Sequence, residues 1–401
     1  MAANAATTIT DRLLNGSDFN VFYKFQTTKG TVDSNPDFTP YRRGEGAPMQ
    51  SKNYTEGADI PQDRQAVKQL EESDEYMGEL SGGFHKQAVA MLIASMAGGN
   101  ETQISETSTG IAADANGFTD TGNNFANLNA GDGFWLTGMT DSSLNRFYVI
   151  TTKNGDGDVE TSPVPATTES AGASATITSN KTYSGETETL LIMQRRAPDT
   201  SKANNTDYLT VYDGYINTFS MEIPDTGVMT HNMNVLFGSR VAGTAIVSGQ
   251  TDNALPTDPE LTATQNVDEF YVADTQQNCT VKSLSLELNN NYQADDGAGC
   301  DKEYAIGQLA VTGNVVVRSP VNNPFVWRDY YDNATDVGTL GVLFSHDSSG
   351  TDQTYICIDN IKVTEHSMPT TSNTTANSEA SFTAQRNDTL STTIRVFRNW
   401  V

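Results

Sequence analysis

A motif that occurs twice at matching internal spacings constrains this chain more than any other feature. The first copy runs from Ile216 to Pro224 and is followed by Phe237, and the second runs from Ile361 to Pro369 and is followed by Phe382. In both copies isoleucine and proline are 8 residues apart, and proline and phenylalanine are 13 residues apart. A second anchor precedes each copy: Gly78-Glu-Leu80 and Gly307-Gln-Leu309. Because the repeating unit has the size of a domain, the pattern predicts a tandem duplication and not a solenoid.

The apolar residues around these motifs alternate with polar ones, which is typical of strands with one buried face. Phe219, Met221 and Ile223 form one such series, and Leu284 to Leu288 contains another. The length of 401 residues predicts two to three domains. Only 18% of the residues are charged, and Thr, Ser, Asn, Asp and Gly are abundant, as expected of a β-rich protein with many turns.

Two short helices interrupt the alternating pattern, one in each copy. Apolar residues with helical spacing follow the first anchor, and Gly98-Gly99 end that segment. The segment Pro324 to Tyr331 predicts the second helix, with proline at its start. The residues expected on the buried face of the first helix are Phe84, Ala88, Met91, Leu92 and Ser95. We therefore predict a mainly β fold, with two tandem β-sandwich or barrel domains that each carry a short flanking helix.

The copies differ by an insert of about 80 residues in the first one. Residues 102–184 contain their own apolar strands, for example Arg146 to Ile150, and predict a small β-barrel carried on a loop. The predicted organisation is a first domain at 1–101 and 185–245, including an N-terminal arm, and the inserted domain at 102–184. An acidic linker at 246–278 and a second domain at 279–401 complete it.

The charge of the chain argues against stable binding of nucleic acid. The formal net charge is −26, from 50 acidic and 24 basic residues. Proteins that hold DNA present clustered Lys and Arg, because their affinity comes from neutralised phosphates. The acidity is also typical of a protein that must avoid self-association.

The sequence offers few candidates for catalysis or metal binding. The four histidines lie far apart, and no motif of a nucleophile elbow, phosphate loop or paired cysteines is present. The segment Asn154 to Glu160 resembles a calcium loop but lacks the required Gly and Glu positions, so we predict a hairpin turn. Trp135, Trp327 and Trp400 adjoin apolar strand or helix residues, which favours core packing or a subunit interface over a sugar platform.

The termini and cysteines predict an intracellular protein with free thiols. The first residues lack a basic region and an apolar core, so no secretory signal is expected. The longest helix-like apolar stretch, Ala88 to Ala97, is too short to span a bilayer. Cys279, Cys300 and Cys357 show no paired spacing.

Several of these segments, taken in order, resemble the major tail tube proteins of long-tailed siphophages. The resemblance rests on Gly57 to Met96, on the insert strand Gly131-Asp-Gly-Phe-Trp-Leu-Thr-Gly138, on Ser283 to Asn290 and on the closing Phe382-Thr-Ala-Gln-Arg386. It covers about residues 20–401. The individual motifs are short, and their order and spacing carry the specificity.

The resemblance implies a structural protein of the virion tail that polymerises as stacked rings into a tube for DNA ejection. The acidity of the chain predicts a negatively charged channel, and the insert at 102–184 is expected to face outward, since it would otherwise block that channel. Members with duplicated domains form trimeric rings with pseudo-sixfold symmetry. The implied partners are other copies of the chain, a tape measure protein, a tail terminator and distal tail or baseplate proteins, with double-stranded DNA in transit only. Neither enzymatic activity, a cofactor nor a membrane is implied, and assembly is expected in the host cytoplasm. The candidate contact residues between subunits or rings are Gly44, Tyr54, Asp63, Arg64 and Gln65.

Two other classes of function remain as alternatives. A surface adhesin or decoration protein that binds glycans or a receptor would need clustered exposed aromatic residues or calcium loops. A carbohydrate-active enzyme would need two carboxylates at a set separation across a cleft.

Overall fold

The computed structural model describes most of the chain, and the statements below refer to that part. The described residues are 18–56, 69–98, 101–199, 206–241, 246–277, 280–295, 303–318, 327–332, 337–347, 349–368 and 377–400.

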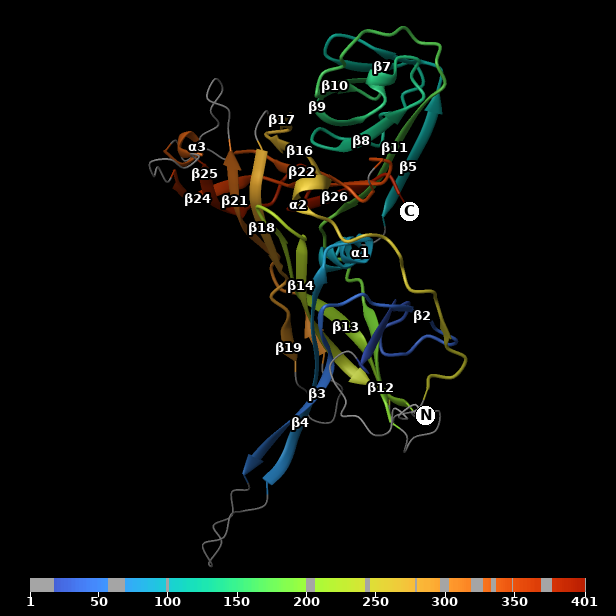
Figure 1. The fold of residues 1–401 in the computed structure, drawn as a ribbon, viewed down its shortest axis with the longest axis vertical. Helices are drawn as coiled ribbons and strands as arrows, with labels where there is room; N and C mark the ends of the chain where they lie inside the picture. Colours follow the sequence, from blue (N-terminus) through green and yellow to red (C-terminus); the bar gives the residue numbers. More distant parts are fainter. Residues whose placement is uncertain are drawn as a thin grey trace, which may run out of the picture.

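The fold is mainly β, which confirms the predicted class (Figure 1). The strands up to the end of the insert are β1 (Asn20–Phe25), β2 (Asp37–Pro40), β3 (Glu45–Glu56), β4 (Gln69–Gly83), β5 (Thr102–Ser108), β6 (Ile111–Ala113), β7 (Gly117–Asp120), β8 (Gly133–Thr137), β9 (Phe147–Gly155), β10 (Asp158–Ser162) and β11 (Ala175–Tyr183). The next are β12 (Leu191–Pro198), β13 (Thr206–Ile223), β14 (Thr230–Arg240), β15 (Thr251–Asp252), β16 (Val267–Val272), β17 (Thr275–Gln276), β18 (Thr280–Asn289) and β19 (Gln293–Asp295). The last are β20 (Glu303–Ala305), β21 (Ala310–Arg318), β22 (Leu340–Ser345), β23 (Gln353–Ile358), β24 (Ile361–Ser367), β25 (Ser378–Ala384) and β26 (Ile394–Arg398). The helices are α1 (Lys86–Ser95), α2 (Ala263–Asn266) and α3 (Arg328–Asp332), with a 3-10 turn at Ser142–Leu144.

Eight antiparallel strands form one continuous row in the order β3-β4-β14-β13-β18-β21-β25-β24. We name β3, β4, β14 and β13 the first quartet and β18, β21, β25 and β24 the second quartet. The two quartets meet where the second half of β13 pairs with β18. The first half of β13 pairs instead with β12, which continues through β1 and β2 to β15. The row therefore joins segments from both halves of the chain in one sheet.

The quartets have the same pairing order and the same irregularity. The β13–β14 pairing shifts register between Ile216 and Thr218, and the β24–β25 pairing shifts between Val363 and Glu365. Ile216 faces Val235, and Val363 faces Phe382, so both strands correspond at an offset of 147 residues. The residues before the shift, Asp213 and Asn360, both have positive φ, 52° and 43°, and they are also 147 apart.

This structural correspondence differs by two residues from the repeat in the sequence, where the offset is 145. It also makes Gly313 the counterpart of Gly78, since Gly78 faces Val235 and Gly313 faces Phe382. Gly307, the sequence anchor, precedes β21 instead. A shift of two residues keeps every side chain on the same face of a strand, so the apolar pattern alone does not distinguish the two alignments.

One face of the eight-strand row lies on a single apolar core that continues through both quartets. Leu80, Met233 and Phe219 belong to it in the first quartet, and Val315 and Phe382 in the second. The opposite side of this core is made by α1 and by outer strands that include β16, β22, β23 and β26. The two halves are thus packed against each other and do not have separate cores.

Helix α1 follows β4 and packs against β13. All five residues expected on its buried face are buried in the structure. The backbone N–H of Lys86 at its start donates to Asp258 Oδ2 at 3.0 Å, so a distant carboxylate satisfies one of the free amides of the first turn. The second helix, α3, confirms the position expected for residues 328–331, while residues 324–326 lie outside the described part.

The insert has its own core, made by residues such as Phe118, Phe134 and Ile150. It is attached to the second half of the molecule by more than a loop. Strand β11 pairs with β26 from Asn180 to Tyr183, which extends the outer sheet β16-β22-β23-β26 into the insert. Figure 1 shows the insert at the end of the molecule opposite the β3–β4 hairpin.

A buried charged group and a cluster of rings hold this junction. The Arg395 guanidinium contacts Asp132 of the insert at 3.0 Å and Asp359 at 2.6 Å, and all three side chains are at most 1% exposed. Trp135 and Phe147 of the insert pack with rings of the second half that include Tyr355. The insert is thereby held on the outer sheet by buried contacts as well as by strand pairing.

The range predicted as an acidic linker, 246–278, contains β15, α2, β16 and β17. Strand β15 pairs with β2, and β16 pairs with β22. The segment therefore connects the outer strands of the two halves through sheet pairing at both of its ends.

Candidate functional site

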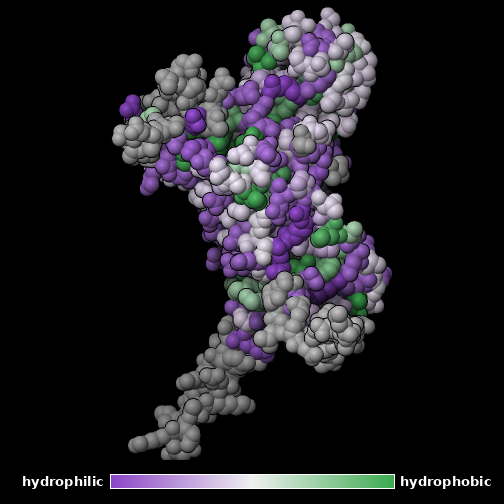
Figure 2. Space-filling view, in the orientation of Figure 1, coloured by the Kyte–Doolittle hydropathy of each residue, from purple (hydrophilic) through white to green (hydrophobic). Residues whose placement is uncertain are grey.

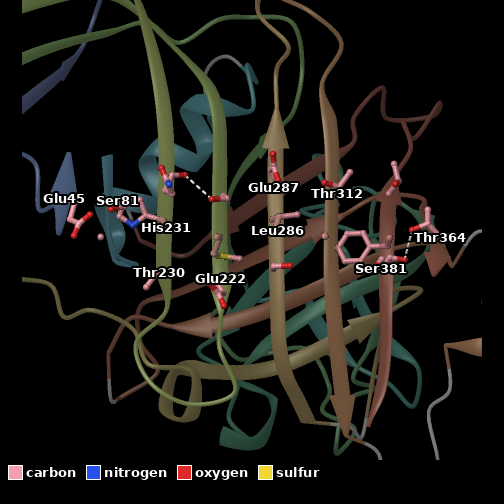
Figure 3. A pocket seen from close by; sticks show the side chains of 18 residues that line it. Glu45, Ser81, Glu222, Thr230, His231, Leu286, Glu287, Thr312, Thr364 and Ser381 are labelled. Atoms are coloured by element: carbon pink, nitrogen blue, oxygen red, sulfur yellow. Dashed lines mark hydrogen bonds between the residues drawn. The ribbon is translucent and has the colours of Figure 1, made fainter. Parts of the chain in front are cut away.

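The second face of the eight-strand row is polar and carries a groove of about 950 Å³ (Figure 3). Side chains alternate along each strand, so the residues between the buried apolar ones point into this groove. In β13, for example, Ser220 and Glu222 are accessible, whereas Phe219, Met221 and Ile223 are buried. We call this surface the polar face.

Paired residues form rows that cross the strands of the polar face. One row, from β3 to β24, is Glu45, Ser81, Asn232, Ser220, Glu287, Thr312, Thr383 and Lys362. The next row, from β14 to β24, is Thr230, Glu222, Ser285, Asn314, Ser381 and Glu365. The rows consist of short hydroxyl and amide side chains with carboxylates at intervals.

Acidic groups outnumber basic groups on this face among the described residues. The groove is lined by Glu45, Glu222 and Glu287 and by no Lys or Arg in the part of the chain that the structure describes. Glu79 and Glu365 are exposed on adjoining positions of the same face. Lys362 ends one row. A surface of this kind offers hydrogen-bonding groups but repels phosphates.

The groove does not contain a catalytic arrangement among the residues described. His231 lies on the core side of the groove. The residue is 2% exposed, and its Nε2 is 2.6 Å from Tyr41 Oη. Burial lowers the pKa of His231 to about 4, and nearby His85 acts in the same direction. The imidazole is therefore a neutral core group. In the described ranges, no group of three or more His, Cys, Asp or Glu side chains is arranged to hold a metal ion.

The other candidates weighed from the sequence are structural in this fold. Asn154 to Glu160 forms the turn between the antiparallel strands β9 and β10, as predicted. Trp135 and Trp327 are buried in the core, as predicted. Trp400 is half-buried and lies under the Lys86 ammonium, 4.9 Å from its ring.

Two of the candidate contact residues, Gly44 and Tyr54, lie at or in strand β3, which forms with β4 a hairpin that extends beyond the body of the molecule (Figure 1). Gly44 precedes β3, and its N–H donates to the Ser81 carbonyl at 2.7 Å. The backbone of Tyr54 pairs with Glu71. Asp63, Arg64 and Gln65 lie outside the described residues. Strand β4 pairs with β14 only from Tyr76 to Gly83, so the outer part of the hairpin is a two-stranded ribbon.

The polar face contains candidate functional residues that the sequence reasoning did not identify. The alternation marks Ser220, Glu222, Ser285 and Glu287 as accessible positions of strands. It does not show that β13 pairs with β18, which brings Ser220 opposite Glu287. Only this pairing joins the polar positions of the two halves into one surface.

Within the described residues, no helix is both long and apolar enough to cross a membrane. The chain matches a protein family described as phage tail tube protein over residues 16–394. No curated protein matches the chain. Because the family match covers nearly the whole sequence, the chain belongs to the phage tail tube protein family.

Proposed function

We propose that this phage tail tube protein assembles as stacked trimeric rings whose inner wall is the polar face, and that the tube conducts DNA out of a siphophage capsid. The observation that carries the proposal is the eight-strand row. Its exposed face is polar and acidic, and its two outer strands, β3 and β24, each pair on one side only among the described residues. Strands with a free edge are templates for pairing with another chain.

The stagger between the quartets fits a closed barrel. The row that starts at Ser81 reaches β21 at Thr312. Leu80 faces Met233, and Val315 faces Ala380. Met233 and Ala380 correspond at the offset of 147 residues, so Leu80 corresponds to Val315 and the next residue, Ser81, corresponds to Val316. The quartets are therefore displaced by four residues over four strands. One residue per strand tilts the strands by about 35° from the barrel axis, as in closed barrels.

The size of the channel favours three chains. Three rows of eight strands give 24 strands, which at a spacing of about 4.8 Å and a tilt of about 35° enclose a backbone diameter of about 45 Å. Side chains occupy about 5 Å on each wall, so a duplex about 20 Å across passes with room for solvent. A ring of two chains has a backbone diameter of about 30 Å and leaves no such room.

The acidic wall supports transit without binding. Each chain adds at least Glu45, Glu222 and Glu287 to the groove. A duplex that moves past carboxylates and neutral hydroxyls meets no series of phosphate-binding sites. The net charge of −26 acts in the same direction at longer range.

The remaining parts of the chain fit the outside and the ends of the tube. The insert lies on the outer sheet, on the side of the core away from the polar face, and we assign it to the exterior. The β3–β4 hairpin, with Gly44 and Tyr54, is assigned to contacts with adjacent subunits or rings. Asp63, Arg64 and Gln65, which lie outside the described residues, are assigned to the same contacts from the sequence. A tape measure protein, a tail terminator and distal tail proteins are the partners proposed for the completed tail, and the host cytoplasm is proposed as the site of assembly.

Electron microscopy of the purified protein tests the proposal. We expect tubes or stacked rings by negative stain, and three chains per ring in a cryo-EM reconstruction, with the polar face toward the channel. Monomers at high concentration would contradict a tube, and six chains per ring would contradict the trimer.

A further inference from the structure

Among the described residues, the two edge strands of the eight-strand row, β3 and β24, each pair on one side only, and a contact inside the molecule shows how two such edges can meet. This contact is the seam between the quartets, where β13, the last strand of the first quartet, pairs with β18, the first strand of the second. In a ring, β24 of one chain meets β3 of the next in the same order. β24 corresponds to β13, and β3 corresponds to β18.

The register of the internal seam is known for each residue. Thr218 faces Asn289, and Ser220 faces Glu287. In β24 the counterparts of Thr218 and Ser220, at the offset of 147, are Glu365 and Ser367. These residues are exposed in the single chain.

The counterparts of Asn289 and Glu287 in β3 follow from the pairing with the neighbouring strands. Met77 of β4 corresponds to Thr312 of β21, because each precedes one of the corresponding glycines, Gly78 and Gly313. Met77 faces Met49 in β3, and Thr312 faces Glu287 in β18. Met49 therefore corresponds to Glu287, and Ser51 corresponds to Asn289. Met49 is 55% exposed in the single chain, so its side chain is accessible to a second copy.

We infer that β24 of one chain pairs with β3 of a second copy in one register, with Glu365 opposite Ser51 and Ser367 opposite Met49. This inference rests on the proposed function, and it adds the residues and the alignment of the contact. The ladder covers 365–367 and 49–51. It stops before Pro48, which has no amide hydrogen to donate.

Two features of the described residues agree with this register. All four side chains lie on the polar face of their own strand, so the channel face continues from one chain to the next. A shift of one residue would turn the apolar residues of β3 or β24 to the wrong face. On the face seen in Figure 2, hydrophobic residues form small separate patches among hydrophilic ones, so backbone pairing at the edges is the stronger basis for assembly.

Disulfide cross-linking in assembled tubes tests the register. Cys279 and Cys300 are first replaced by serine, while Cys357 is fully buried and stays. Chains with Glu365→Cys are mixed with chains with Ser51→Cys before assembly, so that a link forms only between chains. A contact can be linked only where β24 of a Glu365→Cys chain meets β3 of a Ser51→Cys chain, and we expect most contacts of that kind to oxidise, since facing residues in a sheet lie within disulfide reach. The pair Ser367→Cys with Met49→Cys gives a second reading of the same register.

Two controls calibrate the result. The double variant Thr218→Cys and Asn289→Cys places the same geometry inside one chain and should form an internal disulfide. The mixture of Glu365→Cys with Met49→Cys is displaced by two residues, about 7–8 Å, and should remain largely unlinked.

The outcomes separate the register from the tube. Tubes that link at 365 with 51 support the inference, whereas tubes that link only at 365 with 49 or at 367 with 51 overturn the register and leave the tube intact. If the parent chain forms no tubes, the proposed function fails first. A double-cysteine chain, Glu365→Cys with Ser51→Cys, should give covalent trimers as its largest product, which reports the ring size independently.

Discussion

The two quartets share a backbone and differ in the side chains that fill the space beneath it. The pairing order and register shift coincide, yet His231 of the first quartet corresponds to Ser378 of the second, and Phe237 corresponds to Ala384. Val235, in contrast, corresponds to the larger Phe382. The backbone geometry of a strand quartet therefore tolerates a redistribution of core volume, provided that the polar face keeps its alternation. The differences predict where the two halves will respond differently to the same kind of change.

The largest effect on stability is expected at the junction between the second half and the insert, where Arg395 contacts Asp132. Arg395→Met leaves Asp132 and Asp359 buried without their cation, so we expect a loss of about 3–5 kcal/mol in the free energy of unfolding. Denaturant titration measures the loss, and hydrogen exchange should show it first in β11 and β26.

A matched control is Arg398→Met on the same strand. Arg398 pairs with Glu101 at 2.6 Å in a partly exposed position, and its removal should cost about 1 kcal/mol or less. If both variants lost the same free energy of unfolding, the stability contributed by the Arg395 cluster would not depend on its burial.

The corresponding glycines give the next contrast. A methyl group on Gly313 would lie 2.3 Å from the Ser285 carbonyl oxygen and 2.5 Å from the Phe382 ring. On Gly78 its closest contact would be 3.3 Å, to the flexible end of Leu80. We expect Gly313→Ala to destabilise by about 1–3 kcal/mol and Gly78→Ala to change stability by less than about 1 kcal/mol. Thermal unfolding of both variants decides this, and a reversed order would refute the packing difference between the quartets.

Acid should weaken the first quartet through His231, which has no histidine counterpart in the second. Burial lowers the pKa of His231 to about 4, below the ordinary value of 6.5, so protonation favours the unfolded chain. The stability linked to this group is complete above about pH 6.5 and declines as the pH falls toward 4, by on the order of 2–3 kcal/mol.

The variant His231→Gln should lose stability at pH 7 but show a shallower decline between pH 6.5 and 4 than the parent chain. His346, whose pKa burial lowers to about 3, and His85, whose pKa burial also lowers, stay in both proteins and contribute to the remaining slope. Identical slopes in the two proteins would exclude His231 as the group responsible.

The smallest effect on stability is expected on the polar face, where both quartets are alike. Glu222→Lys and Glu287→Lys alter exposed side chains and should change the free energy of unfolding by less than about 0.5 kcal/mol. Tubes should still form, but DNA ejection should slow at low salt and recover as salt rises, because each new cation binds phosphate. The glutamine variants at the same positions are the controls, and we expect them not to slow DNA ejection. If the lysine variants eject DNA at the same rate as the parent protein at low salt, the result would argue against a repulsive channel.

Alternation and helical spacing were enough to predict the mainly β fold, helix α1 and the accessible positions of β13 and β18. Each of these features follows from the periodic order of apolar and polar residues within one strand or one helix, which can be read from a short stretch of sequence. The two copies of the repeated motif lie on strands β13 and β24, which pair alike, but the motif aligns these strands two residues away from the alignment given by their pairing. A shift of two residues leaves the buried and exposed faces of a strand unchanged, so the apolar pattern does not exclude it.

The tertiary structure alone decided how these elements meet. Nothing local to β13 shows that its first half pairs with β12 and its second half with β18, and this division creates the eight-strand row. Arg395 likewise lies 263 residues from Asp132 in the chain, so their contact depends on the docking of the insert. The sequence by itself determined which face of each strand is buried, because that choice depends on the polarity of alternate residues. The neighbours of each strand depend on packing between distant segments, and so does the surface that the strands build together.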